Sequence, residues 1–204
     1  MSNYMFKLTY GLFVLSVNCH KRDNACIINT GIQVASAPDK ISISVCKSDF
    51  TAEMLEYTDD FTLSVISQDA DFSLFKRFGF QSGRDVEKFV NFEDVKRTDN
   101  GCYAILSGTN SYVSAHIDRK IDLGTHILII ATVTGGEVLS TVPSATYEYY
   151  LERIKPKPQT VTENSGKIVW RCRICGYEYV GDDMNEDFIC PVCKHGKSDF
   201  ERVV

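Results

Sequence analysis

Cys172-Arg-Ile-Cys175 and Cys190-Pro-Val-Cys193 are the two motifs that decide how the C-terminal part of this chain folds. They form two CxxC pairs with 14 residues between them. Four thiolates held in two such pairs converge on one tetrahedral metal ion, and all-sulfur sites of this kind bind zinc or iron. A segment of about 40 residues rarely folds without such a metal. The spacing therefore predicts a small metal domain over residues 167–204, with Cys172, Cys175, Cys190 and Cys193 as the ligands.

The composition limits the partners and the compartment. The chain has 204 residues and a formal net charge of −5, which argues against the clustered basic surface of a nucleic-acid-binding domain. We find no signal peptide and no run of 18 apolar residues, so we expect a cytoplasmic protein with no membrane partner. Four further cysteines lack paired spacing, as expected for buried, reduced thiols in a reducing compartment. They are Cys19, Cys26, Cys46 and Cys102.

Residues 1–155 have the pattern of a mostly β domain. Short β-rich runs separated by polar or glycine-bearing turns occur at 11–17, 26–29, 41–46, 61–67, 112–117 and 126–134. This pattern predicts a barrel or a sandwich. Two segments, 51–57 and 70–78, have helical apolar spacing with acidic residues near their starts. Gly135-Gly136 lies between two apolar runs and predicts a hairpin turn.

A linker is expected between the two domains. Residues 156–166 are polar, contain proline and show no hydrophobic period. Eleven extended residues span up to about 40 Å. The metal domain is therefore free to dock away from the β domain of its own chain.

One candidate ligand site lies where an apolar strand leads into a helix. Ile41-Ser-Ile-Ser-Val-Cys46 continues through Lys47-Ser-Asp-Phe-Thr51 into the first helical segment. Free backbone N–H groups at a helix start can hold an anion. The alternative is that Ser48 or Asp49 simply caps the helix.

Two other stretches add to this candidate site. In Phe78-Gly-Phe-Gln-Ser-Gly-Arg-Asp85, Gly83 permits a tight turn and Arg84 offers a planar fork suited to phosphate. A plain surface turn is the alternative. Asn29-Thr-Gly-Ile-Gln-Val-Ala-Ser36 carries hydroxyl and amide groups that face either solvent or a ligand.

In their order along the chain, these segments resemble the flavin reductase-like, FMN-binding split-barrel family. The resemblance covers nearly the whole β domain, through residues 10–14, 24–38, 41–51, 77–85 and 124–126. It implies an FMN-binding split β-barrel with short helices. It also implies a homodimer, because in that family the flavin lies at the interface between two copies.

The resemblance assigns flavin contacts to particular residues. The isoalloxazine and ribityl side receives Asn29, Thr30, Gln33, Ala35 and Ser36. The ribityl phosphate side receives Cys46, Lys47 and Thr51, with Ser82, Gly83 and Arg84 closing over it. Cys46 stands where relatives often carry asparagine, and its thiol is the weaker hydrogen-bonding group. His126, in Gly124-Thr-His126, is the candidate catalytic residue near the nicotinamide approach, with a structural histidine as the alternative.

The residues around the CxxC pairs resemble rubredoxin. The likeness rests on Cys175-Gly-Tyr-Glu-Tyr179, on Gly196-Lys-Ser-Asp-Phe-Glu201 and on a dense set of aromatic residues, which are Trp170, Tyr177, Tyr179, Phe188 and Phe200. Such rings exclude water and tune a reduction potential. The likeness favours one iron ion over zinc. Two features depart from typical rubredoxins: the interval between the pairs is short, and Lys194 stands where glycine is usual.

A flavin-binding barrel joined to a rubredoxin-like domain resembles the high-molecular-weight rubredoxins of anaerobes. The resemblance implies an electron-transport oxidoreductase in which NAD(P)H, a transient donor, reduces FMN and electrons leave singly through iron. The implied acceptor is a flavodiiron protein that reduces oxygen or nitric oxide. No Rossmann G-x-G-x-x-G motif is present, so the nucleotide would bind only transiently. Two alternatives stay open: a flavin reductase that supplies free reduced flavin, and a non-redox binding module with a zinc ribbon.

Overall fold

A computed structural model describes residues 4, 7–156, 168–173, 176–181, 183–190 and 196–203 of the chain. The structure divides into two compact units, Met1–Ile154 and Lys155–Val204. All of the expected linker except Pro156 lies outside the described residues, as do Cys175, Cys193 and Lys194. In the described part of the chain, no helix is long and apolar enough to cross a membrane.

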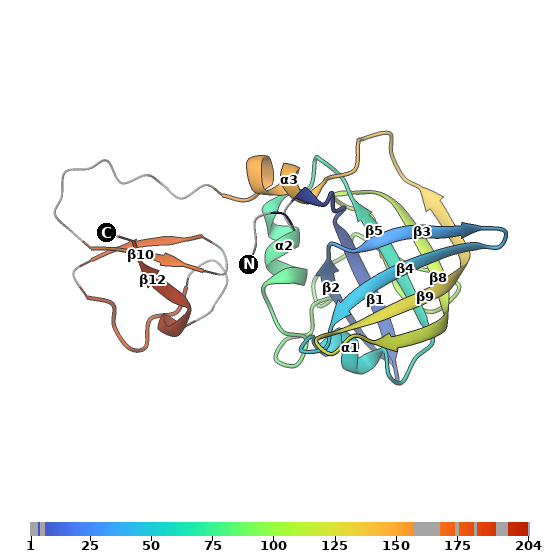
Figure 1. Cartoon of the computed structure of the whole chain (residues 1–204), viewed down its shortest axis with the longest axis horizontal. Helices are drawn as coiled ribbons and strands as arrows, with labels where there is room; N and C mark the ends of the chain where they lie inside the picture. The colour runs from blue at the N-terminus through green and yellow to red at the C-terminus, as the bar shows by residue number, and fades with distance from the viewer. Residues whose placement is uncertain are drawn as a thin grey trace. The chain divides into compact units, whose positions relative to one another are not determined.

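The first unit is built on one seven-stranded antiparallel sheet. Its strands are β1 (Phe13–Cys19), β2 (Arg22–Ile28), β3 (Gly31–Ser36), β4 (Asp39–Cys46), β5 (Asp60–Ile66), β8 (Thr109–Asp122) and β9 (His126–Val138). Their order in the sheet is β2-β1-β5-β8-β9-β4-β3, and the sheet curls into a barrel (Figure 1). The predicted mostly β fold is confirmed.

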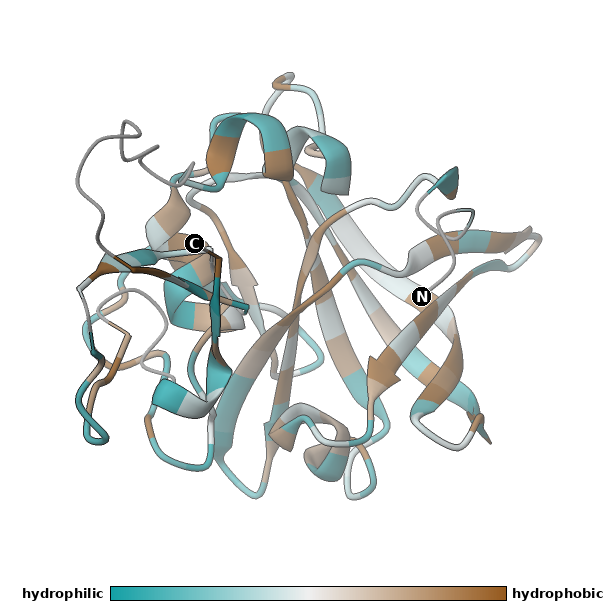
Figure 2. Cartoon of the chain, turned by 60° about the vertical axis from the view of Figure 1, so that its left-hand side comes forward, coloured by the Kyte–Doolittle hydropathy of each residue, from teal (hydrophilic) through white to brown (hydrophobic). Residues whose placement is uncertain are grey.

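The barrel encloses one apolar core. Figure 2 shows apolar segments alternating with polar ones along the strands, as expected when one face of a sheet is buried. Leu15 of β1, Ile43 of β4 and Phe61 of β5 are all 0% exposed and belong to one cluster. Because β1 and β4 are not neighbours in the sheet, this cluster requires the sheet to curl. Each such side chain contributes roughly 1.5–3 kcal/mol when fully buried.

Three short helices flank the sheet: α1 (Phe50–Met54), α2 (Phe72–Gly79) and α3 (Tyr147–Tyr149), the last continued by a π-helical turn, Tyr150–Ile154. Of the two predicted helices, 70–78 closely matches α2. The prediction over 51–57 is too long, because the chain leaves the helix after Met54 to enter β5. At the start of α2, the Asp71 carboxylate accepts a hydrogen bond from the Ser73 N–H at 2.8 Å, which satisfies one free helix donor.

The predicted hairpin turn at Gly135-Gly136 is wrong, because both glycines lie inside β9. The β8–β9 ladder shifts register there, and a Cβ added at Gly136 would lie 2.7 Å from the Tyr112 carbonyl oxygen. Gly136 therefore permits a close approach of the two strands at a bulge. The turn between β8 and β9 instead contains Gly124, at φ +84°. A second, smaller hairpin, β6 (Val95–Arg97) and β7 (Tyr103–Ile105), packs against β5.

The second unit contains a three-stranded antiparallel sheet in the order β11-β10-β12. Its elements are β10 (Val169–Cys172), β11 (Glu178–Val180), a 3₁₀ turn (Lys197–Asp199) and β12 (Phe200–Arg202). The strands are only three or four residues long. So small a sheet has little apolar area to bury, which agrees with a need for a metal ion.

Candidate functional site

Part of the predicted flavin site converges on one cavity of the barrel, with a volume of about 240 Å³. Its lining consists of Leu12, Ile27, Ile28, Asn29, Ser44, Cys46, Asp49, His126 and Tyr147. Asn29, Cys46 and His126 are predicted site residues. They come from three elements that are distant in sequence, and the fold brings them together.

Strand register places two of these residues side by side. Cys46 at the end of β4 pairs directly with His126 at the start of β9. The Lys47 N–H donates to the Thr125 carbonyl oxygen at 3.0 Å, which holds the two strand ends together. His126 is exposed, and its Nδ1 lies 2.9 Å from the Thr125 hydroxyl. The other ring nitrogen is thereby left for a second partner.

The two cations predicted on the phosphate side are held by carboxylates. Lys47 Nζ lies 2.8 Å from Asp122, outside the cavity that contains Cys46. Arg84 makes a two-pronged ion pair with Glu53 and lowers the pKa of that carboxyl. Both pairs are exposed, and exposed ion pairs contribute little to stability. A phosphate group can therefore compete for either cation, so these residues fit the predicted role.

Hydrogen bonds hold the loop of Ser82, Gly83 and Arg84 against the barrel. Arg22 donates to the Gly83 carbonyl oxygen at 2.7 Å, and the Arg84 N–H donates to the Ser82 hydroxyl at 3.1 Å. Beneath it, the buried Asn24 amide donates to the Thr51 hydroxyl at 2.9 Å. Thr51 is 1% exposed, so it supports the loop from inside.

Gly83→Ala is expected to displace this loop, because a Cβ there would lie 2.1 Å from the Asn24 side-chain oxygen. Asn24 is 2% exposed and bonded to Thr51, so it cannot move away freely. We expect a loss of about 1–3 kcal/mol in unfolding free energy and weaker flavin binding, measured by denaturation and fluorescence titration. Gly135→Ala is the matched control, since nothing lies within 4 Å of its added Cβ. Equal behaviour of the two variants would contradict the prediction.

Other predicted flavin contacts lie outside the cavity. Gln33, Ala35 and Ser36 belong to β3, an edge strand of the sheet that forms a hairpin with β4 (Figure 1). The Gln33 amide donates to Asp39 at 3.0 Å and to the Ala35 carbonyl oxygen at 3.2 Å. Thr30 donates to the Asn29 side chain at 3.1 Å, so it orients a cavity residue.

Asp49 and Tyr147 line the cavity although the sequence predicted neither as a site residue. The sequence suggests Asp49 only as a helix cap, yet its side chain accepts no capping hydrogen bond. Burial raises the pKa of the Asp49 carboxyl, and the positive charges of Lys88 and His126 oppose that rise. Tyr147 is held by its N–H, which donates to the Tyr10 carbonyl oxygen at 2.9 Å. The sequence around Tyr147 contains no motif that would predict its place in the cavity lining.

A buried lysine lies close to this site. The Lys88 side chain is 4% exposed, and its ammonium donates to the carbonyl oxygens of Ala25 at 2.8 Å and Phe78 at 3.0 Å. Burial lowers the pKa of Lys88, while Cys26 and Asp49 oppose that shift. The ammonium thus joins β2 to the end of α2.

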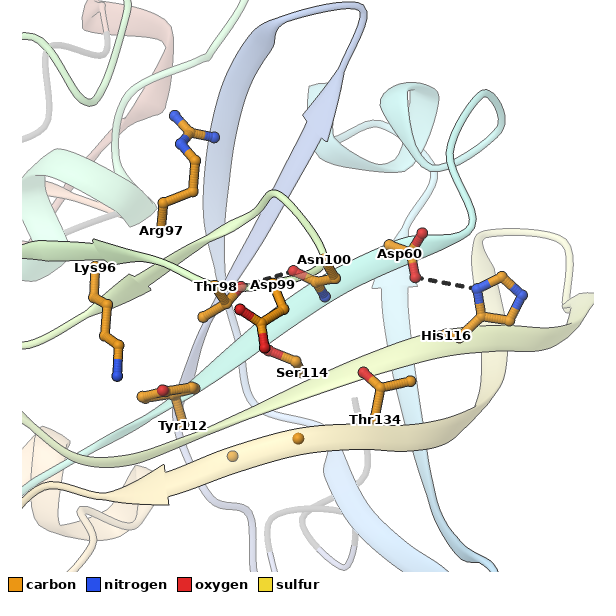
Figure 3. A pocket seen from close by; sticks show the side chains of 12 residues that line it. Asp60, Lys96, Arg97, Thr98, Asp99, Asn100, Tyr112, Ser114, His116 and Thr134 are labelled. Carbon is orange, nitrogen blue, oxygen red and sulfur yellow. Dashed lines mark hydrogen bonds and ion pairs between the residues drawn. The ribbon is translucent and has the colours of Figure 1, made fainter.

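A larger cavity, of about 390 Å³, contains none of the predicted site residues. It lies against β5, β8 and β9 beside the β6–β7 hairpin (Figure 3). At one end of it (Figure 3), His116 Nδ1 on β8 lies 3.1 Å from the carboxylate of Asp60 on β5. Lys96 pairs with Glu137 at 2.7 Å. Arg97 pairs with Asp23 at 2.8 Å, so the lysine and the arginine that line this cavity both already have a carboxylate partner.

The second unit places two of the four predicted metal ligands in its interior. Cys172 is 1% exposed and Cys190 is 0% exposed. A tight turn surrounds Cys172, whose N–H donates to the Tyr177 carbonyl oxygen and whose carbonyl oxygen accepts from the Gly176 N–H, both at 2.8 Å. Buried thiols at a tight turn fit a thiolate-held iron or zinc ion.

Four of the five aromatic residues predicted to cluster in this unit pack together. The Phe188 ring lies 5.4 Å from the Phe200 ring and 4.8 Å from the Tyr179 ring, and the Tyr177 ring lies edge-on to Phe200. Phe200 itself pairs with Cys172 across β10 and β12. The rings therefore lie beside Cys172, a predicted metal ligand, where aromatic packing would exclude water.

The barrel cysteines differ from these ligands. Cys19, Cys26 and Cys102 are buried as predicted, whereas Cys46 is only partly buried and lines the cavity of about 240 Å³. Burial raises the pKa of Cys26 to about 12 and that of Cys102 to about 11. Such thiols stay protonated and are poor nucleophiles and metal ligands at neutral pH.

Comparison with known proteins finds a family match for each of the two units. Residues 5–157 match the flavin reductase like domain, and residues 170–201 match the rubredoxin-like domain of rubrerythrin. The chain is 32% identical over 223 residues to a high molecular weight rubredoxin of Moorella thermoacetica, with 96% of each chain covered. The chain belongs to the high molecular weight rubredoxin family. This family combines a flavin-binding domain with an iron-binding domain, and both are expected to carry electrons.

Members of related families support oxidoreductase activity for this high molecular weight rubredoxin family member. The chain is 27% identical over 158 residues to the ferric-chelate reductase (NAD(P)H) of Archaeoglobus fulgidus, which covers 77% of this chain and 93% of the relative. In fold, the barrel is similar to the NADH:FAD oxidoreductase SgcE6 of Streptomyces globisporus, with a TM-score of 0.64. That alignment covers 71% of this chain and 84% of the other at 17% identity, so it shows the fold alone.

Proposed function

We propose that the protein is an NAD(P)H-dependent flavin/rubredoxin oxidoreductase that passes electrons through FMN to a four-cysteine iron centre. The observation that carries this proposal is the presence, in one chain, of the cavity at Asn29, Cys46 and His126 and of the buried thiols Cys172 and Cys190. The ferric-chelate reductase relative is named for NAD(P)H, which supports a nicotinamide donor.

Each side chain has a role that the geometry supports. When bound, flavin and iron supply hydride acceptance and one-electron transfer, which no side chain can perform. Asn29 and His126 would orient the ring in the cavity, and the Thr125 hydroxyl fixes the His126 imidazole at 2.9 Å. Lys47 and Arg84 would exchange their carboxylate partners for the phosphate of FMN. Cys172, Cys175, Cys190 and Cys193 would hold the iron.

A homodimer would complete the flavin site. The cavity of about 240 Å³ is smaller than the roughly 300–1,000 Å³ of ordinary ligand pockets. Beside it, β3 exposes the apolar side chains of Ile32 (62%) and Val34 (48%). A second copy that covers this strand would bury them and bring Gln33 and Ser36 near a flavin. Light scattering should give twice the 23.0 kDa mass of one chain, with one flavin per chain. A monomer that retains flavin would contradict this arrangement.

Anaerobic stopped-flow mixing with NADH or NADPH tests the proposed activity. We expect flavin absorbance to bleach first and the ferric-thiolate charge-transfer band to fade afterwards, because only the flavin can accept a hydride. A purified flavodiiron protein should then reoxidise both centres. If neither nucleotide reduces the flavin, the reductase role fails. Extraction of the bound flavin distinguishes FMN from FAD.

Two outcomes would favour the alternatives. Loss of reduced flavin during gel filtration would indicate a reductase that supplies free flavin to another enzyme. A colourless protein with one zinc ion per chain would indicate a non-redox binding module. The first visible spectrum of the purified protein therefore separates the electron carrier from the zinc-ribbon alternative.

A further inference from the structure

Asp49 occupies the flavin cavity through a specific backbone turn. The Asp49 N–H donates to the Cys46 carbonyl oxygen at 3.0 Å and closes a tight turn at the end of β4. Cys46 in turn pairs with His126 across the β4–β9 ladder. Asp49, Cys46 and His126 therefore line one cavity, although the first two residues are separated from His126 by about eighty positions of sequence.

The Asp49 carboxylate is not used to hold the fold together. Asp49 is the N-cap residue of α1, with extended backbone angles of φ −75° and ψ 137°. Its side chain nevertheless accepts no capping hydrogen bond, and within the described residues no hydrogen bond or ion pair engages it. Partial burial of this carboxylate costs desolvation free energy, and no hydrogen bond or ion pair in the described part of the chain offsets that cost. Such a group is more typical of a functional site than of a structural contact.

The charged and titratable groups around Asp49 come from every element near it. His126 on β9 and Cys46 on β4 share the cavity, and Lys88 and the buried Cys26 on β2 interact with it electrostatically. The Cys26 thiol stays protonated because burial raises its pKa to about 12. The Cys46 thiol is engaged with the Ser48 hydroxyl at 3.1 Å. Asp49 and His126 are thus the carboxyl and imidazole groups that line the cavity, and Tyr147 on α3 adds a phenol.

We propose that Asp49 and His126 together hold and release the protons that accompany electron flow through this cavity. The inference rests on the proposed function. Reduction of the flavin consumes one hydride from NAD(P)H and one proton from the solvent. Return to the oxidised flavin sends two electrons, one at a time, to ferric iron and releases two protons. A carboxylate and an imidazole at the cavity would take those protons and pass them to water.

Asp49→Asn tests the proposal in the flavin-loaded protein. Asparagine keeps the size of the side chain but cannot hold an acidic proton, so flavin binding should persist. We expect photochemically reduced flavin to deliver electrons to iron about 100-fold more slowly, the lower range for lost acid–base catalysis. The pH dependence and solvent isotope effect of that step should also fall, whereas Asp49→Glu should restore both. Stopped-flow spectroscopy measures each quantity.

Glu56→Gln is the matched control, because it removes one exposed carboxylate from the same short region of chain. An Asp49→Asn protein with wild-type rate and pH profile would overturn the proposal. A wild-type flavin that NAD(P)H fails to reduce would contradict the proposed donor only, since photochemical reduction still tests Asp49. The two failures are therefore distinguishable.

Flavin-free protein provides an independent measurement. Burial raises the pKa of Asp49 above its ordinary 3.8, so the folded protein binds more protons than the unfolded chain between these two values. The wild type should lose stability as pH rises through that window, and Asp49→Asn should not. Thermal unfolding should therefore show a stability gain for Asp49→Asn that grows from pH 3.8 upward and then levels off. Parallel curves for the two proteins would overturn the proposal.

Discussion

Cys190→Ala is expected to abolish electron delivery to a one-electron acceptor while NAD(P)H still bleaches the flavin. Cys190 is 0% exposed and is one of the four predicted thiolate ligands, so its loss would leave the site incomplete. Metal binding supplies most of the folding free energy of so small a unit, and the strands around Cys172 should therefore unfold as well. We expect iron content to fall from one per chain to near zero, measured by elemental analysis and by the visible charge-transfer band.

Cys102→Ala is the control for this experiment. Cys102 is a buried thiol of the barrel whose pKa is raised to about 11, so it is not expected to bind metal. Its removal should leave iron content unchanged. Normal iron content and normal electron delivery in Cys190→Ala would disprove the predicted ligand set.

Lys88→Met is expected to lower the unfolding free energy by about 2–5 kcal/mol, because two buried carbonyl oxygens lose a charged donor. Those acceptors belong to Ala25 on β2 and Phe78 on α2. Methionine fills a similar volume, so the effect reports the ammonium group and not a cavity. Removing a buried charge returns some desolvation free energy, which is why the expected range is wide.

Chemical denaturation with tyrosine circular dichroism would measure this change. Lys76→Met provides the comparison, since Lys76 is exposed and its ammonium lies 5.5 Å from the Phe72 ring. We expect the Lys76 variant to stay within about 0.5 kcal/mol of the wild type. Equal stability of the two variants would show that the Lys88 hydrogen bonds add nothing.

Local sequence patterns predict those parts of the fold that are determined by residues close together in the chain. Short β-rich runs separated by turns predict a barrel or a sandwich, and the CxxC spacing predicts a small metal domain. The error at Gly135-Gly136 arises because a glycine pair favours a hairpin turn and a strand bulge for the same reason, the absence of a side chain. Only the close approach of the Tyr112 carbonyl oxygen distinguishes them.

The site depends more strongly on contacts between distant residues, and there the sequence is less informative. The flavin reductase resemblance led to Asn29, Cys46 and His126, which share a cavity in the structure. It gave no indication that Arg84 would pair with Glu53, or that Asp49 would enter the cavity without a capping bond. Those outcomes are set by the folding of separate loops onto one another, which no local pattern encodes.

The single tryptophan of the chain, Trp170, makes the second unit optically distinct. Its indole N–H donates to the Gly181 carbonyl oxygen at 3.3 Å, between β10 and the residue after β11. Tryptophan emission from the intact protein therefore comes entirely from the metal-binding unit. Its intensity and wavelength should report iron loading and local unfolding there, while flavin emission in the same sample reports the barrel. The two halves can be followed independently without any introduced label.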